Sequence, residues 1–182
     1  MATNQVLFVH GAGGEAFGED EALVRSLREA LGPDFAVEYP EMPDADAPEF
    51  AKWRARISQE LSALDGEVIL VGHSLGGSIP LKHLSEERVE EPIAGLFLIA
   101  TPYWGTVDWK VAQFALREDF PEALPEDVPI FLYHSRDDEV VPFAHLAMYA
   151  GRLPLASIRA FDDRGHQLGD DLSEVAEDIA RL

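Results

Sequence analysis

"VILVGHSLGG", residues 68–77, joins an apolar run to a serine that is flanked by glycines. Residues 68–71 have the length and composition of a strand that is buried on both faces. Gly72 and Gly76 stand on either side of Ser74 and leave room for a sharp turn from a strand into a helix. Such a turn strains the backbone of its central residue and projects the hydroxyl above the sheet. The stretch therefore predicts an α/β fold and makes Ser74 a candidate nucleophile.

The rest of the chain repeats this alternation of strand and helix. Short apolar runs occur at residues 6–9, 35–39, 68–71, 96–100, 130–133 and 157–161. Stretches with helical periodicity lie at residues 19–31, 47–64, 75–85, 107–117, 143–150 and 172–182. Strands that alternate with helices predict a parallel sheet with helices on both faces. The sequence shows no internal repeat, no linker and no segment long enough for a cap domain, so we expect a single domain over residues 1–182.

The composition excludes several classes of protein. The 182 residues include no cysteine, which excludes disulfides, thiolate metal sites and cysteine nucleophiles. No apolar run approaches the roughly 20 residues of a membrane span, and the first residues lack the features of a signal peptide. We therefore expect a cytoplasmic protein that does not enter membranes. With 14 basic against 34 acidic residues, the net charge of −20 predicts repulsion from nucleic acid and from anionic membranes.

Polar segments follow the predicted strands at the positions where an α/β sheet binds its ligands. In open sheets of this kind, ligands bind beyond the carboxyl ends of the strands. The first strand is followed by "HGAGG" (10–14), the fifth by "HSRDDEVVP" (134–142) and the sixth by "DDRGH" (162–166). The fold would therefore gather a serine, several acids and a histidine at one edge of the sheet.

A serine hydroxyl is a weak nucleophile, and its chemistry defines the partners it needs. A base must take its proton, and histidine suits this role because it titrates near neutral pH. We predict His166 as this base. A carboxylate then holds the imidazole in the right tautomer; Asp137 and Asp138 are both candidates, and Asp162 and Asp163 also precede His166. The alternative is that Asp137 and Asp138 only cap the helix that follows them.

The substrate and its oxyanion need further groups. The main-chain N–H groups of Leu75 and of the turn at Gly11 and Ala12 are candidate oxyanion donors. Tyr103 and Trp104 follow the fourth strand and would line a pocket for the acyl group, unless they serve only as packing. No histidine pair has the helical spacing of metal ligands beside an acid, so we expect no metal and no cofactor.

Several segments together resemble a known family. They are "FVHGAGG", "YPEMPDADAPEFAKW", "VGHSLGG", "SRDDEVVPF" and the late "GH". With these segments the chain resembles the α/β hydrolases, and more narrowly the small capless serine hydrolases related to retinoblastoma-binding protein 9. The resemblance covers nearly the whole chain. It implies a three-layer α/β-hydrolase sandwich, with a six-stranded, all-parallel sheet in the chain order 2-1-3-4-5-6 and no cap domain.

The resemblance also implies a reaction, and with it a small-molecule ester as the binding partner. The reaction is hydrolysis of small carboxylic esters, and of thioesters, through an acyl-enzyme on Ser74, with Asp138 and His166 completing a triad. Asp138 is preferred over Asp137 because it matches the family's Asp-x-x-Val-Pro pattern. Two alternatives stay open: a non-enzymatic interaction protein on a hydrolase scaffold, and an acyltransferase or perhydrolase that uses the same triad. One residue departs from the pattern, since Pro80 within the predicted helix would remove a backbone bond and kink it.

Overall fold

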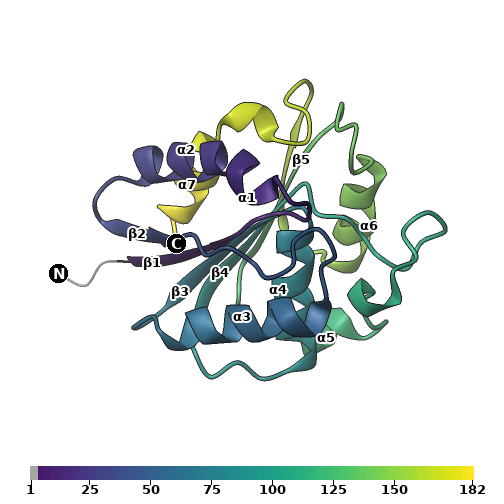
Figure 1. Ribbon diagram of the computed structural model, residues 1–182, viewed down its shortest axis with the longest axis horizontal. Coiled ribbons are helices and arrows are strands. Elements are labelled where there is room, and N and C mark those ends of the chain that lie inside the picture. The colour runs from purple at the N-terminus through teal and green to yellow at the C-terminus, as the bar shows by residue number, and fades with distance from the viewer. Residues whose placement is uncertain (1–3) are drawn as a thin grey trace.

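One parallel sheet runs through the centre of the molecule (Figure 1). The computed structural model describes residues 4–182. The strands are β1 (Asn4–Val9), β2 (Phe35–Glu38), β3 (Val68–His73), β4 (Ile93–Ile99), β5 (Ile130–Ser135) and β6 (Ser157–Phe161). They lie in the order β2-β1-β3-β4-β5-β6, and each neighbouring pair is parallel. This arrangement confirms the predicted six-stranded sheet and its strand order.

Helices cover both faces of this sheet. The α-helices are α1 (Ala16–Glu19), α2 (Glu21–Leu31), α3 (Phe50–Ser62), α4 (Leu75–Glu86), α5 (Phe120–Ala123), α6 (Ala144–Arg152) and α7 (Ser173–Ile179). In Figure 1, α2 and α7 lie together on one side of the strands, and α3 and α4 lie on the other. The molecule is therefore the three-layer sandwich that the sequence predicted. Within residues 4–182, no helix is long and apolar enough to cross a membrane.

Successive side chains of β1 point to opposite faces of the sheet, and both faces are covered, which explains the continuous apolar run in its sequence. Leu7 and Val9 belong to the core that includes α3 and α4, whereas Val6 and Phe8 belong to the core that includes α2 and α7. All four side chains are fully buried. Because both faces of the strand are covered, an apolar residue is favoured at every position instead of at every second one.

The helix predicted over residues 107–117 is wrong. This segment forms a loop with a single 3₁₀ turn, and the next α-helix along the chain is the short α5. The apolar spacing has another cause, because Trp109 and Phe114 both pack against Trp104 with ring centroids 5.0 Å apart. Val107, which would lie on the apolar stripe of such a helix, is 78% exposed. An aromatic cluster, and not a helical face, therefore produced the pattern.

The first turn of α4 approaches the strands so closely that only glycine fits. A Cβ atom on Gly76 would lie 2.1 Å from the carbonyl oxygen of Val9 and 2.4 Å from that of His10. A Cβ atom on Gly72 would lie 2.1 Å from the carbonyl oxygen of Gly76. Gly72 and Gly76 therefore set the distance between this helix and the sheet. The helix continues through Pro80, so the proline does not end it.

Replacing Gly76 by alanine should destabilise the fold, because the added methyl group would meet main-chain atoms that cannot rotate away. Overpacking of this kind costs about 1–3 kcal/mol and would appear as a lower midpoint in urea unfolding. Gly151→Ala is the control, since an added Cβ at this position in α6 would meet no atom within 4 Å. That variant should be unchanged or stabilised by up to about 1 kcal/mol. Equal unfolding free energies for the two variants would contradict the close approach.

Candidate active site

Ser74 lies at the turn between β3 and α4, in the strained conformation that the sequence predicted. Its φ of 55° and ψ of −125° fall outside the regions that most non-glycine residues adopt. The Ser74 N–H donates to the carbonyl oxygen of Ile99 at 2.8 Å, and the Gly77 N–H donates to that of Ser74 at 2.9 Å. These bonds hold this elbow, residues 72–76, at the carboxyl edge of the sheet.

The turn after β1 lies directly against Ser74. A Cβ atom on Gly11 would be 3.3 Å from the Cβ of Ser74. We call Gly11 and Ala12 the oxyanion turn. The Gly11 N–H donates to a carboxylate oxygen of Asp20 at 2.9 Å, so it is already engaged. We therefore leave Gly11 out of the candidate oxyanion donors and keep Ala12 and Leu75.

His10 fixes the peptide that carries the Ala12 N–H. Its Nδ1 lies 2.7 Å from the carbonyl oxygen of Gly11, and its Nε2 accepts the N–H of Met42 at 2.8 Å. Since Nε2 accepts, Nδ1 carries the proton and donates to Gly11. Burial lowers the pKa of His10, which keeps the ring in this neutral form. The Gly11 carbonyl and the Ala12 N–H belong to one trans peptide and point in opposite directions, so the Ala12 N–H points away from His10.

His166, in the loop after β6, forms a hydrogen bond with Asp138, in the loop after β5. The His166 Nδ1 and the Asp138 Oδ2 are 2.8 Å apart. The Asp138 side chain is fully buried, while the His166 side chain is 16% exposed. The other carboxylate oxygen, Oδ1, accepts the N–H groups of Val140 and Val141, both at 2.8 Å. The carboxylate is therefore fixed by the backbone while one of its oxygens faces the imidazole.

A second histidine shares this carboxylate. The Nε2 of His134 lies 3.1 Å from the Oδ2 of Asp138 and 2.9 Å from the carbonyl oxygen of Val141. Because both neighbours are acceptors, this nitrogen carries a proton. Burial alone would raise the pKa of Asp138, but the hydrogen bonds from His134 and His166 outweigh it and hold the pKa well below its usual range. Asp138 is therefore ionised at neutral pH.

Asp137 has a different role from its neighbour. It is exposed, and its Oδ1 accepts the Ser135 hydroxyl at 2.5 Å and the Gly165 N–H at 2.8 Å. The hydrogen bond from Ser135 lowers the pKa of Asp137, with a further contribution from the Gly165 N–H. The Ser135 oxygen also accepts the N–H of Arg164 at 2.9 Å. Together these two side chains hold the loop of residues 162–167, which we call the base loop.

The candidate nucleophile and the candidate base are linked through His73. Its Nε2 lies 2.9 Å from the carbonyl oxygen of His166, and the two rings have centroids 4.7 Å apart. Within residues 4–182, no hydrogen bond joins the Ser74 hydroxyl to His166. Contacts between a nucleophile and its base often tighten only when substrate binds. The structure thus brings all three residues of the predicted triad to one edge, with the contact between acid and base formed.

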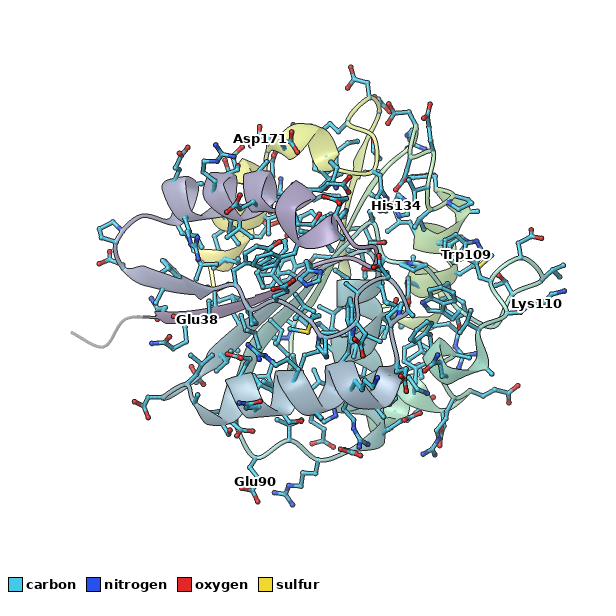
Figure 2. The ribbon with its side chains drawn as sticks, in the orientation of Figure 1. Glu38, Glu90, Trp109, Lys110, His134 and Asp171 are labelled. Atoms are coloured by element: carbon cyan, nitrogen blue, oxygen red, sulfur yellow. The ribbon has the colours of Figure 1, made fainter. Side chains whose placement is uncertain are left out.

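Tyr103 and Trp104 lie in the loop that follows β4. Figure 2 shows Trp109 of this loop on the same side of the molecule as His134. The Trp104 Nε1 donates to the hydroxyl of Ser78 at 3.0 Å. Tyr103 and Trp104 are both half-buried, so packing fixes one side of each residue and leaves the other accessible.

The described residues offer no metal centre. Over residues 4–182, no group of three or more histidine, aspartate or glutamate side chains is placed to hold a metal ion. The acids and histidines at this edge pair with one another instead, as His166 does with Asp138 and His73 does with Asp20.

Sequence reasoning missed Asp20 as a residue of this site. Asp20 falls within the helical stretch predicted over residues 19–31, where a charged residue is ordinarily expected on the exposed face. In the structure the side chain is 1% exposed and contacts Gly11 and His73. His134 was also missed as a partner of Asp138, because a histidine that closes a strand carries no signal of a nearby carboxylate. Both roles depend on contacts between distant segments.

The family of the chain follows from its sequence. The pattern of the serine hydrolase family matches residues 9–171, which is most of the chain. The chain belongs to this family, and it is an enzyme, a hydrolase. No curated protein matches it.

Solved structures share the fold over nearly the whole chain. The ydeN gene product of B. subtilis has a TM-score of 0.78 at 21% sequence identity, with 98% of each chain covered. A protein from Xanthomonas campestris pv. campestris, described as a hydrolase of the α/β superfamily, has a TM-score of 0.69 at 25% identity and covers 98% of this chain and 99% of its own. SOBER1 of Arabidopsis thaliana has a TM-score of 0.72 at 17% identity, with 99% of each chain covered. These likenesses confirm the predicted α/β-hydrolase fold.

Lowering the pH should weaken the fold through Asp138. Its pKa in the folded protein lies below the ordinary value of 3.8, so the unfolded chain binds the proton more readily. The stability that this group contributes is therefore present above the unfolded pKa and is lost as the pH falls through the folded pKa. We expect the difference in unfolding free energy between wild type and Asp138→Asn, measured in urea, to shrink below about pH 4.

Asp162→Asn is the control for this titration, because the Asp162 side chain is 87% exposed. The difference in unfolding free energy between Asp162→Asn and wild type should stay small at every pH. A pH-independent difference for Asp138→Asn would contradict the stabilising bonds assigned to that carboxylate.

Proposed function

We propose that this hydrolase cleaves small carboxylic esters through an acyl-enzyme on Ser74, with His166 as general base and Asp138 as the acid that orients it. The observation that carries the proposal is the 2.8 Å bond between His166 Nδ1 and Asp138 Oδ2, formed beside a serine with a φ of 55°. The carboxylate is ionised and can only accept, so Nδ1 carries the proton. The Nε2 lone pair of the neutral ring is then free to take the serine proton.

The reaction divides into two halves with the same protein groups. The Ser74 Oγ bonds to the ester carbonyl carbon while its proton passes to His166. The carbonyl oxygen gains the negative charge, which the N–H groups of Ala12 and Leu75 stabilise. As this intermediate collapses, the bond to the alcohol oxygen breaks and that oxygen takes the proton from His166. Water then attacks the acyl-enzyme in the same manner, and the carboxylic acid leaves with Ser74 restored.

Two local charges favour these steps. The Leu75 N–H lies at the N-terminus of α4, where the helix dipole is positive and an oxyanion is favoured. The ionised Asp138 stabilises the imidazolium that forms on His166 after proton transfer.

The apolar surface offered by Tyr103 and Trp104 suits a small acyl group. No helix or strand lies between Ile99 and Ala112, so one loop carries both Tyr103 and Trp104. Their half-buried rings offer an apolar contact of limited extent. Thioesters would follow the same steps with a thiol as the leaving group, and the partner is in each case a small molecule.

Replacing Ser74 by alanine should abolish covalent labelling by a fluorophosphonate probe, because the probe reacts with an activated serine. Hydrolysis of p-nitrophenyl acetate should fall by at least about 10³-fold, since the nucleophile acts as a unit with its base. Ser62→Ala is the matched control, as Ser62 is an exposed residue at the end of α3. Folded wild-type protein that neither labels nor hydrolyses the ester would refute the proposal.

The same assay separates hydrolysis from acyl transfer. Adding methanol or hydrogen peroxide as a competing nucleophile shows which acceptor takes the acyl group from Ser74. Release of the free acid as the main product supports hydrolysis, whereas a dominant methyl ester or peracid would favour the acyltransferase or perhydrolase alternative.

Acidic side chains around the base loop should set a charge preference. Asp137, Asp162 and Asp163 are exposed there, so neutral or cationic esters should react faster than matched carboxylate-bearing esters. At low salt we expect kcat/KM for a neutral ester to be about 10 times that for its carboxylate-bearing counterpart. This ratio should fall toward 1 as salt screens the charges.

Paired variants test this preference. Asp162→Asn combined with Asp163→Asn should narrow the ratio. Glu90→Gln should not, because Glu90 precedes the amino end of β4 whereas the base loop follows the carboxyl end of β6, and these ends lie at opposite edges of the parallel sheet. Equal rates for both ester types at low salt would show that the rim charges do not select substrate.

A further inference from the structure

Asp20 is a buried acid that the proposed mechanism leaves unused. It lies between α1 and α2, at the position where an aspartate ordinarily caps a helix, but its side chain makes no capping bond. The residue is only 1% exposed. A carboxylate buried to this extent is stable only with partners inside the protein, and these partners indicate what it does.

The partners of Asp20 come from three separate segments. Its Oδ2 accepts the Gly11 N–H at 2.9 Å and lies 2.9 Å from the Nδ1 of His73. Its Oδ1 accepts the side-chain amide of Gln167 at 3.2 Å. These residues belong to the oxyanion turn, the end of β3 at the elbow, and the base loop. One carboxylate therefore contacts every segment that carries a group of the proposed reaction except the one with Asp138.

Both ring nitrogens of His73 face hydrogen-bond acceptors. Its Nδ1 faces the carboxylate of Asp20, and its Nε2 faces the carbonyl oxygen of His166 at 2.9 Å. Both neighbours are acceptors, and a histidine donates from both nitrogens only as an imidazolium. The ring is 2% exposed, so water does not take the place of either partner.

We propose that Asp20 and His73 form a buried ion pair that fixes the oxyanion turn, the elbow and the base loop relative to one another. Both are positioning residues: they contact no reacting atom and act through the main chain of Gly11, Ser74 and His166. The assignment of these segments to catalysis rests on the proposed function, whereas the ion pair itself is a property of the fold.

The pKa shifts of the two groups agree with this geometry. Burial alone would lower the pKa of His73 and raise that of Asp20, but their mutual attraction reverses both directions. The contribution of Asp20 is lost only as the pH falls through its lowered pKa, and that of His73 only as the pH rises through its raised pKa. Each group of the pair thus favours the charged form of the other. Other titratable groups that face it are His10, Tyr39, Asp138 and His166.

Asp20→Asn removes the charge of the pair with little change in shape. A neutral His73 has a proton on one ring nitrogen only. If that proton stays on Nδ1, bonded to the amide oxygen at position 20, then Nε2 faces the His166 carbonyl as a second acceptor. The bond to the base loop is then lost, and the candidate base is no longer held beside Ser74.

NMR of protein labelled with ¹⁵N in its histidines tests the pair directly. Near neutral pH, His73 should show the nitrogen shifts of an imidazolium in the wild type and those of a neutral ring in Asp20→Asn. The kcat for p-nitrophenyl acetate should fall by about 10- to 100-fold with KM little changed, the effect expected when a reacting group is misplaced. The amide signals of Gly11 and Gln167 should shift in the same variant.

Asp178→Asn is the matched control for the loss of a buried acid. Asp178 is 7% exposed, lies in α7 and accepts the Tyr133 hydroxyl at 2.8 Å and the Arg159 guanidinium at 2.7 Å. This variant should lose stability while keeping the His73 charge and the wild-type kcat. The double variant Asp20→Asn with His73→Asn should lose no more kcat than the more affected single variant, because the pair acts as a unit.

A neutral His73 in the wild type near neutral pH would overturn the inference, and this measurement needs no variant to fold. The inference would also be overturned if Asp20→Asn folds, keeps the wild-type kcat and leaves the NMR amide signals of Gly11 and Gln167 unshifted. If the wild type neither labels nor hydrolyses esters, the proposed function fails, but the His73 nitrogen shifts and the two amide signals still decide the ion pair.

Discussion

The close approach of α4 to the sheet is the constraint on which the rest of this edge depends. Gly72 and Gly76 lack the Cβ atoms that would hold the helix away from the sheet. The helix can then begin at the very end of β3, and Ser74 has to turn with a φ of 55° to allow it. The strain of such a residue, of order 1–3 kcal/mol, is small beside the two cores that press the helices onto both faces.

Two pairs of an acid and a histidine meet at this edge under different physical conditions. In one pair His166 is partly exposed, so it can exchange protons with a substrate and with water while Asp138 stays fixed by backbone N–H groups. In the other pair His73 and Asp20 are both buried, and their charges hold each other in place. The first arrangement suits a group that changes its protonation during a reaction, and the second suits one that does not.

Local patterns of apolar residues were enough to predict the sheet. The site was harder to predict, because its contacts join residues that are far apart in the sequence. Strands buried on both faces leave a visible apolar run, so the parallel sheet and its layers could be predicted, whereas the strand order came from the family resemblance. The helix over residues 107–117 failed because aromatic rings there pack on one another. The residues alone left Asp137 and Asp138 open as the acid, and the choice of Asp138 came from a family pattern. Asp20 could not be found, because its partner His73 is 53 positions away and burial leaves no local mark.

The loop after β4 is attached to the molecule by contacts of its own. Trp104 packs on Trp109 and Phe114 and donates to the Ser78 hydroxyl. Within residues 4–182, none of these contacts involves Asp20 or Asp138. The loop is therefore anchored through Ser78 to the helix that begins at Leu75, and not through either carboxylate. A substitution in this loop would reach the site through the position of α4, whereas one at Asp20 or Asp138 would reach it through the histidine that each acid holds.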